Sequence, residues 1–551
     1  TTEIYTLSLH DALPISTPYG MPPFDHIAPE HYAPAFETAM AAHRAEVEAI
    51  AANPDAPTFE NTIVALDAAG ALMQQVAGVF YNLISSETSD ALQAVERAMM
   101  PKLAAHSSWL SLHEGLFHRV DDLHTRRASL GLNPEQMRML ERVHLDFVME
   151  GALLAGDARK RYAQITEELA GLFTTFSQAV LADEAAFALE LKTDADKAGL
   201  PEFVLDAAKS VAADKGVEGY VINLSPSLVD PFLTYSSRRD LREAVWKAYK
   251  ARGEADPARD TRPVAQRIVQ LRAELAGLMG YKNFADYALV DRMAKKPQAV
   301  EDLLMKVWKP ARARALEEQA EMEALARKEG FTGSIMGWDW RYYAEKLRQE
   351  KYALDEGELK QYLQLDHMMA AMFDAASRLY GITFTEVSGV PLYHPDARLF
   401  EMRDTASGDL RGVFIHDAFA RATKRGGAWM SDFRSQSRNR PGGLPYPIVI
   451  NNTNFAKAPE GKPTLLSLDD LRTLFHEFGH GLHGLLSDVT YSRLSGTNVL
   501  RDFVELPSQI NEHWALTPQM LKKHALHAMT GKPISDEFIS LIKKTEHFNQ
   551  G

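Results

Sequence analysis

Two histidines four residues apart, with a glutamate directly after the first, are the clearest sign of chemistry in this 551-residue chain. They lie in His476-Glu477-Phe478-Gly479-His480, which has the form H-E-x-x-H. Residues i and i+4 of a helix share one face, so both imidazoles reach a single metal ion if this segment is helical. The motif therefore predicts a metal site with His476 and His480 as ligands.

A catalytic zinc site needs a third protein ligand and an open position for water. Residues 501–512 (RDFVELPSQINE) offer three carboxylates: Asp502, Glu505 and Glu512. At helical spacing Glu505 and Glu512 lie on one side, so one can bind the metal while the other orients a ligating histidine through its free ring N–H. Spacing alone does not choose among the three.

The motif needs a helix to hold it, and the flanking sequence predicts one. Ser467 and Asp470 match a capping box, and Asp469 suits the positive end of the helix dipole. An apolar stripe follows at helical spacing: Leu471, Leu474, Phe475, Phe478, Leu482 and Leu485. The two histidines and Glu477 fall away from this stripe. The helix is expected to have one buried face and one chemical face.

Composition narrows the classes of protein and of metal. The chain has no cysteine, so disulfides, thiolate ligands and a cysteine nucleophile are excluded, and a metal must bind to His, Asp and Glu, which suits zinc. A net charge of −14 argues against a nucleic-acid partner. We expect no membrane partner, because no apolar run approaches the roughly 20 residues that span a bilayer. The missing cysteines favour the cytoplasm without excluding the periplasm.

The length allows two or more lobes, and the predicted secondary structure changes along the chain. Residues 1–16 are expected to be a non-native leader, residues 17–235 an N-terminal helical region, and residues 236–551 the catalytic region. Residues 29–192 predict an all-helical lobe, and further helices are predicted at 239–252, 263–278, 297–328 and 356–380. Strand-like segments at 392–402, 411–418 and 447–451, broken by residues 441–443 (PGG), predict a small sheet just before the motif helix.

Residues 475–483 (FHEFGHGLH) followed by residues 502–509 (DFVELPSQ) resemble the M3 family of metallopeptidases, the thimet oligopeptidase family. The likeness extends over nearly the whole chain from Thr17, and within the family it is to the peptidyl-dipeptidases. Further matching segments, in order, are 23–27 (PFDHI), 57–62 (PTFENT), 338–340 (WDW), 393–396 (YHPD), 426–430 (GGAWM) and 494–498 (LSGTN). Several independent matches in one order make coincidence negligible.

The resemblance implies a fold and a ligand set. The fold is a mainly α, two-lobed helical clamshell with a deep channel and a small β-sheet near the zinc site. Glu505 is the third ligand, beside His476 and His480, and one Zn²⁺ binds per chain. The narrow channel limits substrates to short unstructured peptides, and we expect a monomer.

The chemistry that follows is hydrolysis of a peptide bond. The metal lowers the pKa of its bound water, and Glu477 takes the water's proton and later delivers it to the leaving amine. We also expect residues 426–430 and 447–455 to line the channel, with an edge strand that pairs with the extended peptide. By resemblance the products are C-terminal dipeptides.

Two alternatives remain open from the sequence. One is an endopeptidase of the same family that cuts internal bonds, as oligopeptidases do. The other is an inactive peptide-binding fragment, because the resembling peptidases continue past the position of Gly551. That segment carries the family's glycine-rich stretch with tyrosine and histidine donors to the substrate carbonyl. His513, His524, His527 and His547 do not replace these donors. The chain is therefore expected to be truncated at its C-terminus and poorly active.

Overall fold

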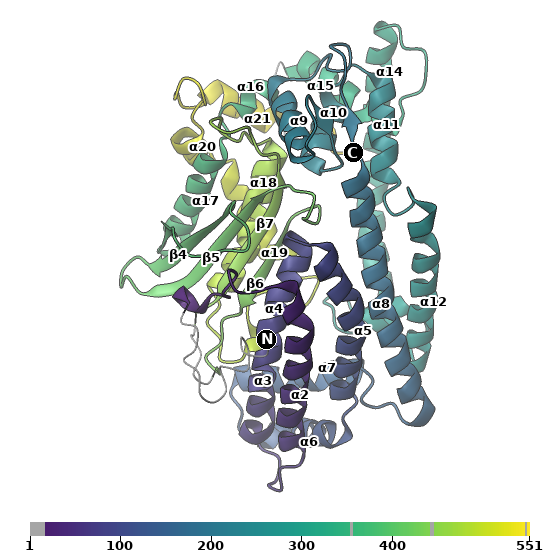
Figure 1. The fold of residues 1–551 in the computed structure, drawn as a ribbon, viewed down its shortest axis with the longest axis vertical. Helices are drawn as coiled ribbons and strands as arrows, with labels where there is room; N and C mark the ends of the chain where they lie inside the picture. Colours follow the sequence, from purple (N-terminus) through teal and green to yellow (C-terminus); the bar gives the residue numbers. More distant parts are fainter. Residues whose placement is uncertain (1–16, 353–355, 441–445, 546–547) are drawn as a thin grey trace.

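The computed structural model describes residues 17–352, 356–440, 446–545 and 548–551. The predicted leader at 1–16, the break at 441–443 and His547 lie outside the described residues. The fold is mostly helical with one small five-stranded sheet, as the sequence predicts (Figure 1). The sheet and the helices that pack on it lie on one side of the molecule, and long helices fill the other side (Figure 1).

The N-terminal region is a set of helices joined by short loops. They are α2 (Tyr32–Ala51), α3 (Ala65–Ala68), α4 (Ala71–Ser86), α5 (Asp90–Ser111), α6 (Glu114–Thr125), α7 (Pro134–Met149) and α8 (Gly156–Ala186). The prediction of an all-helical lobe over 29–192 is wrong at its end. There β1 (Leu189–Glu190) pairs with β2 (Val221–Ile222). Strands of two residues are too short to show a periodic pattern in sequence.

One helical run in this region, Phe59–Ser86, is long and apolar enough to cross a membrane by length and composition alone. This run differs from the expectation that no apolar run approaches the roughly 20 residues that span a bilayer. It is not one straight helix, because Ala69 is extended and Gly70 has a φ of +76° between α3 and α4. In α4 the ring of Phe80 packs edge-on against Phe36, so this side of the run is buried in the protein.

A second group of helices connects this region to the sheet. It comprises α9 (Glu202–Asp214), α10 (Pro226–Tyr235), α11 (Arg239–Lys250), α12 (Arg262–Leu278), α13 (Phe284–Leu289), α14 (Pro297–Lys328), α15 (Gly337–Tyr352), α16 (Glu356–Lys360) and α17 (Leu365–Tyr380). The predicted helix 356–380 is two helices. Its backbone breaks because Leu365 N–H donates to Thr464, and the carbonyl of Leu363 accepts from Leu466.

The sheet has the strand order β3-β4-β5-β7-β6. Its strands are β3 (Ile382–Val387), β4 (Ala397–Asp404), β5 (Leu410–Phe419), β6 (Trp429–Arg434) and β7 (Ile448–Phe455). The pair β5·β7 is parallel, and the other neighbours are antiparallel. The prediction for 411–418 is confirmed, that for 447–451 falls short of the end of β7, and β3 and β6 were missed. The predicted strand 392–402 begins only at Ala397, because a turn precedes it in which Ala397 N–H donates to the carbonyl of His394.

Both faces of the central strands are covered. On one face Phe414 packs against Phe478 of α18 (Leu468–Leu485), with ring centroids 5.3 Å apart. On the other face Val413 and Ile415 pack with Met21 from the start of the described chain. Three helices complete the chain: α19 (Glu505–Ala515), α20 (Pro518–His524) and α21 (Asp536–Thr545). The sheet thus forms a rigid support directly beneath the motif helix.

Candidate metal centre

The motif helix α18 begins as its sequence predicts. Ser467 is the N-cap, its hydroxyl accepts from the backbone N–H of Asp470 at 3.0 Å, and the Asp470 carboxylate accepts from Ser467 N–H at 2.9 Å. This reciprocal pair satisfies two backbone donors that a helix start leaves free. All six residues of the predicted apolar stripe are buried. The helix is therefore held at its first turn and along its inner face.

The face that carries the motif is more enclosed than predicted. Glu477 and His480 are 6% and 8% exposed, so α18 is buried on both sides at this point. The cover is α19, which lies against it. A Cβ at Gly479 would come within 2.6 Å of Ser508 Cα and 2.9 Å of the Pro507 carbonyl oxygen. Only glycine fits here, and its absent side chain lets the two helices approach closely.

This close approach brings the three predicted ligands together. Glu505 Oε2 lies 3.1 Å from Nε2 of His476 and 3.1 Å from Nε2 of His480. One donor atom from each residue lies within 4.8 Å of the others. Donors bound to zinc at about 2.0 Å in a tetrahedral site are about 3.3 Å apart, so this spacing fits a zinc ion. Two imidazoles and a carboxylate are also a donor set that zinc prefers.

The other two candidate carboxylates go elsewhere. Glu512 Oε1 lies 2.7 Å from Nδ1 of His476, on the ring nitrogen that faces away from Glu505. Asp502 instead accepts hydrogen bonds from the backbone N–H groups of Met293 and Ala294, at 2.8 and 2.9 Å. Glu512 is thus placed to orient a ligand, and Asp502 fastens the loop before α19 to the residues before α14.

Neighbouring groups hold Glu505 as a carboxylate. Its Oε2 accepts a hydrogen bond from the hydroxyl of Ser508 at 2.8 Å. Burial alone would raise the pKa of Glu505, but the Ser508 hydroxyl and the two histidines hold that pKa below its ordinary value. The Glu505 side chain is 55% exposed, which leaves one side of the three donor atoms open. An open position of this kind is what a catalytic rather than a structural metal site requires.

Glu477 lies beside these donors without joining them. Burial raises the pKa of its carboxyl to about 7. Its Oε2 atom is buried and has no hydrogen-bond partner among the described residues. Burial likewise lowers the pKa of His480, which favours the neutral imidazole that a metal ligand needs. The arrangement leaves a carboxylate free to exchange a proton next to the three donor atoms.

A cavity of about 510 Å³ opens over His476 and Glu477. Pro226 of α10 lines its far side, and Gly427 and Ala428 line it from the loop before β6. Asn454 and Phe455 at the end of β7 complete this wall. Parts of both segments predicted to line a channel thus meet at the candidate site. β6 is an edge strand of the sheet, whereas β7 lies between β5 and β6.

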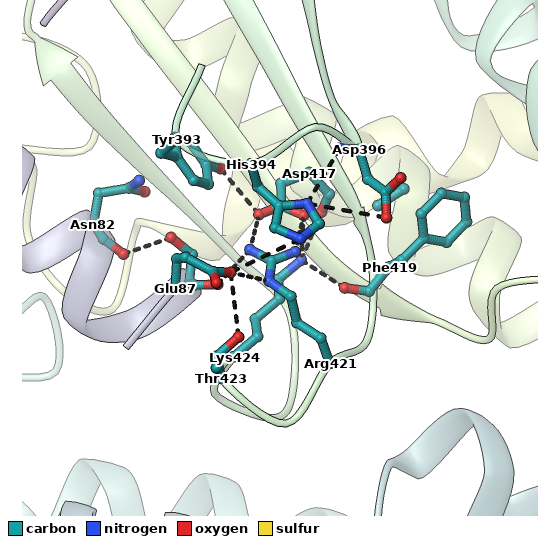
Figure 2. A network of polar contacts seen from close by, with 12 residues as sticks. Asn82, Glu87, Tyr393, His394, Asp396, Asp417, Phe419, Arg421, Thr423 and Lys424 are labelled. Atoms are coloured by element: carbon teal, nitrogen blue, oxygen red, sulfur yellow. Dashed lines mark hydrogen bonds and ion pairs between the residues drawn. The ribbon is translucent and has the colours of Figure 1, made fainter. Parts of the chain in front are cut away.

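A buried ion cluster fixes the loop that carries Gly427 and Ala428. Figure 2 shows the carboxylate of Asp417, on β5, among Tyr393, Arg421 and Lys424. Arg421 donates to Asp417 at 2.7 and 2.8 Å and to Glu87 at 2.6 Å, so the cluster joins the sheet to the loop between α4 and α5. The Asp417 and Lys424 side chains are fully buried. Such a cluster holds its members in one geometry, because the loss of any partner leaves a buried charge unpaired.

Lys424 extends this cluster to β7. Its Nζ donates to the carbonyl oxygens of Phe419 at 3.1 Å and Thr453 at 2.6 Å. One residue on, the Asn454 side-chain amide donates to the carbonyls of Arg425 and Gly427 at 2.8 and 2.6 Å. The backbone at the cavity wall is therefore fastened from both ends.

Several residues that shape the site were not predicted from the sequence. Asn511 donates to the carbonyl of Phe475 at 2.6 Å and so joins α19 to α18. Ser508 and the Asp417 cluster were also missed. A signal existed for Gly479, because a glycine in the middle of a helical motif lowers helix stability and calls for a packing reason. Ser508, three residues after Glu505, had the spacing for a contact within one helical turn.

Comparison with known proteins gives a consistent set of relatives. A family model described as Peptidase family M3 matches residues 232–551. Proteins named Dipeptidyl carboxypeptidase from Salmonella typhimurium and Escherichia coli are each 40% identical, over 97% of this chain and 78% of theirs. Oligopeptidase A of Salmonella typhimurium is 34% identical, over 97% of this chain and 79% of its own.

Proposed function

Because the chain belongs to peptidase family M3, we propose that it is a zinc-dependent peptidase that releases dipeptides from the C-termini of short peptides. The observation that carries this proposal is the approach of Glu505 Oε2 to Nε2 of His476 and of His480, at 3.1 Å in each case. Beside them lies the Oε2 atom of Glu477, which has no hydrogen-bond partner in the described part of the chain. In this proposal one Zn²⁺ binds per chain, and His476, His480 and Glu505 are its ligands.

Each residue has a separate task in this proposal. When bound, the zinc ion supplies a Lewis acid that lowers the pKa of a coordinated water and polarises the scissile carbonyl. With zinc bound, Glu477 would take a proton from the coordinated water at Oε2, which has no hydrogen-bond partner among the described residues, and would later give that proton to the leaving amine. Glu512 holds the His476 ring with Nδ1–H toward itself, so Nε2 presents its lone pair to the metal position. Ser508 orients Glu505 by donating its hydroxyl hydrogen to Oε2.

The cavity wall supports a peptide rather than a folded protein as substrate. Its backbone at residues 427–428 and 454–455 comes from a loop and a strand end that are held rigidly. Extended peptides bind to such backbone by main-chain hydrogen bonds, which a folded substrate does not offer. A volume of about 510 Å³ over His476 and Glu477 admits only a few residues at a time.

The release of dipeptides is tested by the products. A mixed library of short peptides is digested with the zinc-loaded protein, and the fragments are identified by mass spectrometry. Under the proposal, fragments shorter by two residues and free C-terminal dipeptides accumulate together. The second candidate is an endopeptidase, which the 34% identity to Oligopeptidase A favours. Cuts at internal bonds, without dipeptides, contradict dipeptide release and leave the metal chemistry standing.

The remaining parts of the proposal concern where and how the enzyme works. We place it in the cytoplasm as a monomer, without a nucleic-acid or membrane partner, on the basis of its cysteine-free sequence and net charge of −14. Sedimentation equilibrium measures its mass in solution, and fractionation of the source cells measures its location. A stable dimer or recovery with the membrane fraction contradicts the corresponding part.

A further inference from the structure

Arg472 is a cation on the motif helix that the mechanism above does not use. It lies one helical turn before His476 on α18 and lines the same cavity as His476 and Glu477. Its side chain is partly buried, and it has no hydrogen bond or ion pair within the described part of the chain. A guanidinium in a cavity is usually paired, because its five N–H donors lose water on burial.

The charges around the cavity single out Arg472 further. It is the only lysine or arginine among the described residues that line the cavity. Four acids line it as well. Asp470 is engaged in the cap of α18, Glu512 at the His476 ring and Glu477 beside the three donor atoms, while Asp469 lies one turn before Arg472 on the same helix. Arg472 thus presents a positive charge and a planar set of donors to whatever occupies the cavity. A carboxylate is the ligand that matches this geometry, through two parallel N–H···O bonds.

The distance along α18 suits the end of a dipeptide. Two extended residues span about 7 Å. Four residues of an α-helix, the step from Arg472 to His476, rise about 6 Å. A peptide whose scissile carbonyl lies at the metal ligands therefore has its C-terminus, two residues on, within reach of the Arg472 side chain.

We propose that Arg472 binds the C-terminal carboxylate of the substrate and thereby sets cleavage two residues from the end. This inference rests on the proposed dipeptide release and names the group that recognises the free end. Arg472 touches substrate, so it determines specificity and does not act through the metal ligands.

Two other cations near the cavity are less suited. Arg341 forms an ion pair with Asp230 of α10 at 2.9 Å. Arg425 lies over the ring of Trp429, 4.4 Å from its centroid, and does not line the cavity. Arg425 nevertheless has no ion pair among the described residues, so it is the rival that an experiment has to separate from Arg472.

The test measures binding, so it does not depend on turnover. In the zinc-loaded Glu477→Gln protein, the Kd of an N-acetylated tetra-alanine is measured by calorimetry for the free acid and for the C-terminal amide. A charge-assisted bidentate contact predicts that the acid binds about 10- to 100-fold more tightly. Adding Arg472→Gln should lower the affinity for the acid nearly to that for the amide and leave the affinity for the amide unchanged. Arg472→Lys should retain an intermediate preference for the acid, because lysine keeps the charge and lacks the planar pair of N–H donors.

Matched controls define the remaining outcomes. Arg411→Gln removes an exposed cation on β5 that does not line the cavity, and should keep the full preference for the acid. A bound zinc content of one per chain shows that each variant is folded at the site. If Arg472→Gln weakens the binding of acid and amide equally, the proposal is overturned. An unchanged ratio of the two Kd values overturns it as well. If Arg425→Gln abolishes the preference for the acid, Arg425 binds the carboxylate, and the proposal for Arg472 is overturned.

The failure of dipeptide release is distinguishable from the failure of this inference. If the Glu477→Gln parent binds acid and amide equally and the library yields no dipeptides, dipeptide release is wrong and the inference falls with it. If dipeptides are released and the parent prefers the acid, but Arg472→Gln keeps that preference, the assignment of Arg472 alone is wrong.

Discussion

Nδ1 of His476 lies 2.7 Å from Oε1 of Glu512, and so the two helices of the site meet through a histidine and a carboxylate. A proton on Nδ1 donated to Glu512 would leave the lone pair of Nε2 directed toward Glu505. A carboxylate behind a ligating imidazole fixes its orientation and raises its basicity. Glu512 was one of three open choices in the sequence, and it lies at the ring nitrogen opposite the one that faces Glu505.

Replacement of Glu512 should weaken zinc binding without abolishing it. Glu512→Gln keeps the shape and removes the charge, so we expect zinc affinity to fall by about 10- to 100-fold. Competition with a chelator of known affinity measures this fall. The matched control is Asp502→Asn, which changes a nearby acid that bonds to backbone of Met293 and Ala294 and should leave zinc affinity unchanged. If Asp502→Asn lowers zinc affinity and Glu512→Gln does not, the assignment of Glu512 to the His476 ring is wrong.

Glu477→Gln separates metal binding from chemistry. The variant should retain one zinc per chain and lose turnover by about 10²–10⁴-fold, because the amide keeps the size of the side chain but accepts no proton. Zinc content is measured by atomic absorption, and peptide cleavage on the same sample. Near-normal cleavage by the variant would show that another group acts as the base.

Removal of any one ligand should lower zinc occupancy itself. His476→Ala, His480→Ala and Glu505→Ala each leave two protein ligands, which is too few for a stable catalytic zinc site. Occupancy after dialysis against a weak chelator is the measurement. If Glu505→Ala kept full zinc while Glu512→Ala lost it, Glu512 would be the ligand and Glu505 the outer carboxylate.

The glycine inside the motif should be required for the close approach of α18 and α19. Gly479→Ala places a Cβ 2.6 Å from Ser508 Cα, so the helices must separate, at a cost of about 1–3 kcal/mol in unfolding free energy. Zinc affinity should fall as well, because Glu505 moves with α19. The control is Gly171→Ala in α8, where an added Cβ meets nothing within 4 Å. That substitution should stabilise the protein by up to about 1 kcal/mol. Equal effects in urea titrations of the two variants would falsify this account.

Acid should weaken the ion cluster behind the cavity wall. Burial alone would raise the pKa of Asp417, but hydrogen bonds from Arg421 and the charge of Lys424 outweigh it and lower the pKa from 3.8 to about 2. Since the pKa is lower in the folded state, the ionised Asp417 stabilises the fold above about pH 4, and this contribution disappears as the pH falls toward 2.

The variant Asp417→Asn tests this pH dependence. It leaves Lys424 without its counter-ion in a fully buried position, and should lower the unfolding free energy at pH 7 by about 3–5 kcal/mol. Urea titrations at a series of pH values should show the gap to the unmodified protein narrowing between pH 4 and 2. A gap that stays constant over this interval means that Asp417 is not the group that titrates.

Local features of the site could be predicted because they depend on residues close in sequence. The Ser467 cap, the apolar stripe of α18 and the shared face of His476 and His480 all follow from helical periodicity, and the structure has each of them. The helix at 297–328 was predicted with its observed bounds for the same reason. The missed strand β6 shows the limit. It is an edge strand that pairs with β7, which follows it in the chain, and that pairing depends on the rest of the sheet.

The sequence by itself determined that this chain carries a paired-histidine metal motif on an amphipathic helix in a mainly helical protein. Its matching segments also indicated the peptidase family. Only the tertiary structure decided where each nearby carboxylate lies and what it contacts. Asp502, Glu505 and Glu512 are chemically alike and close in sequence, and their environments differ because α19 packs on α18 at Gly479. The same packing and the walls from α10 and β7 place Arg472 in one cavity with His476 and Glu477. Contacts between segments far apart in the chain set these distances, and no local pattern records them.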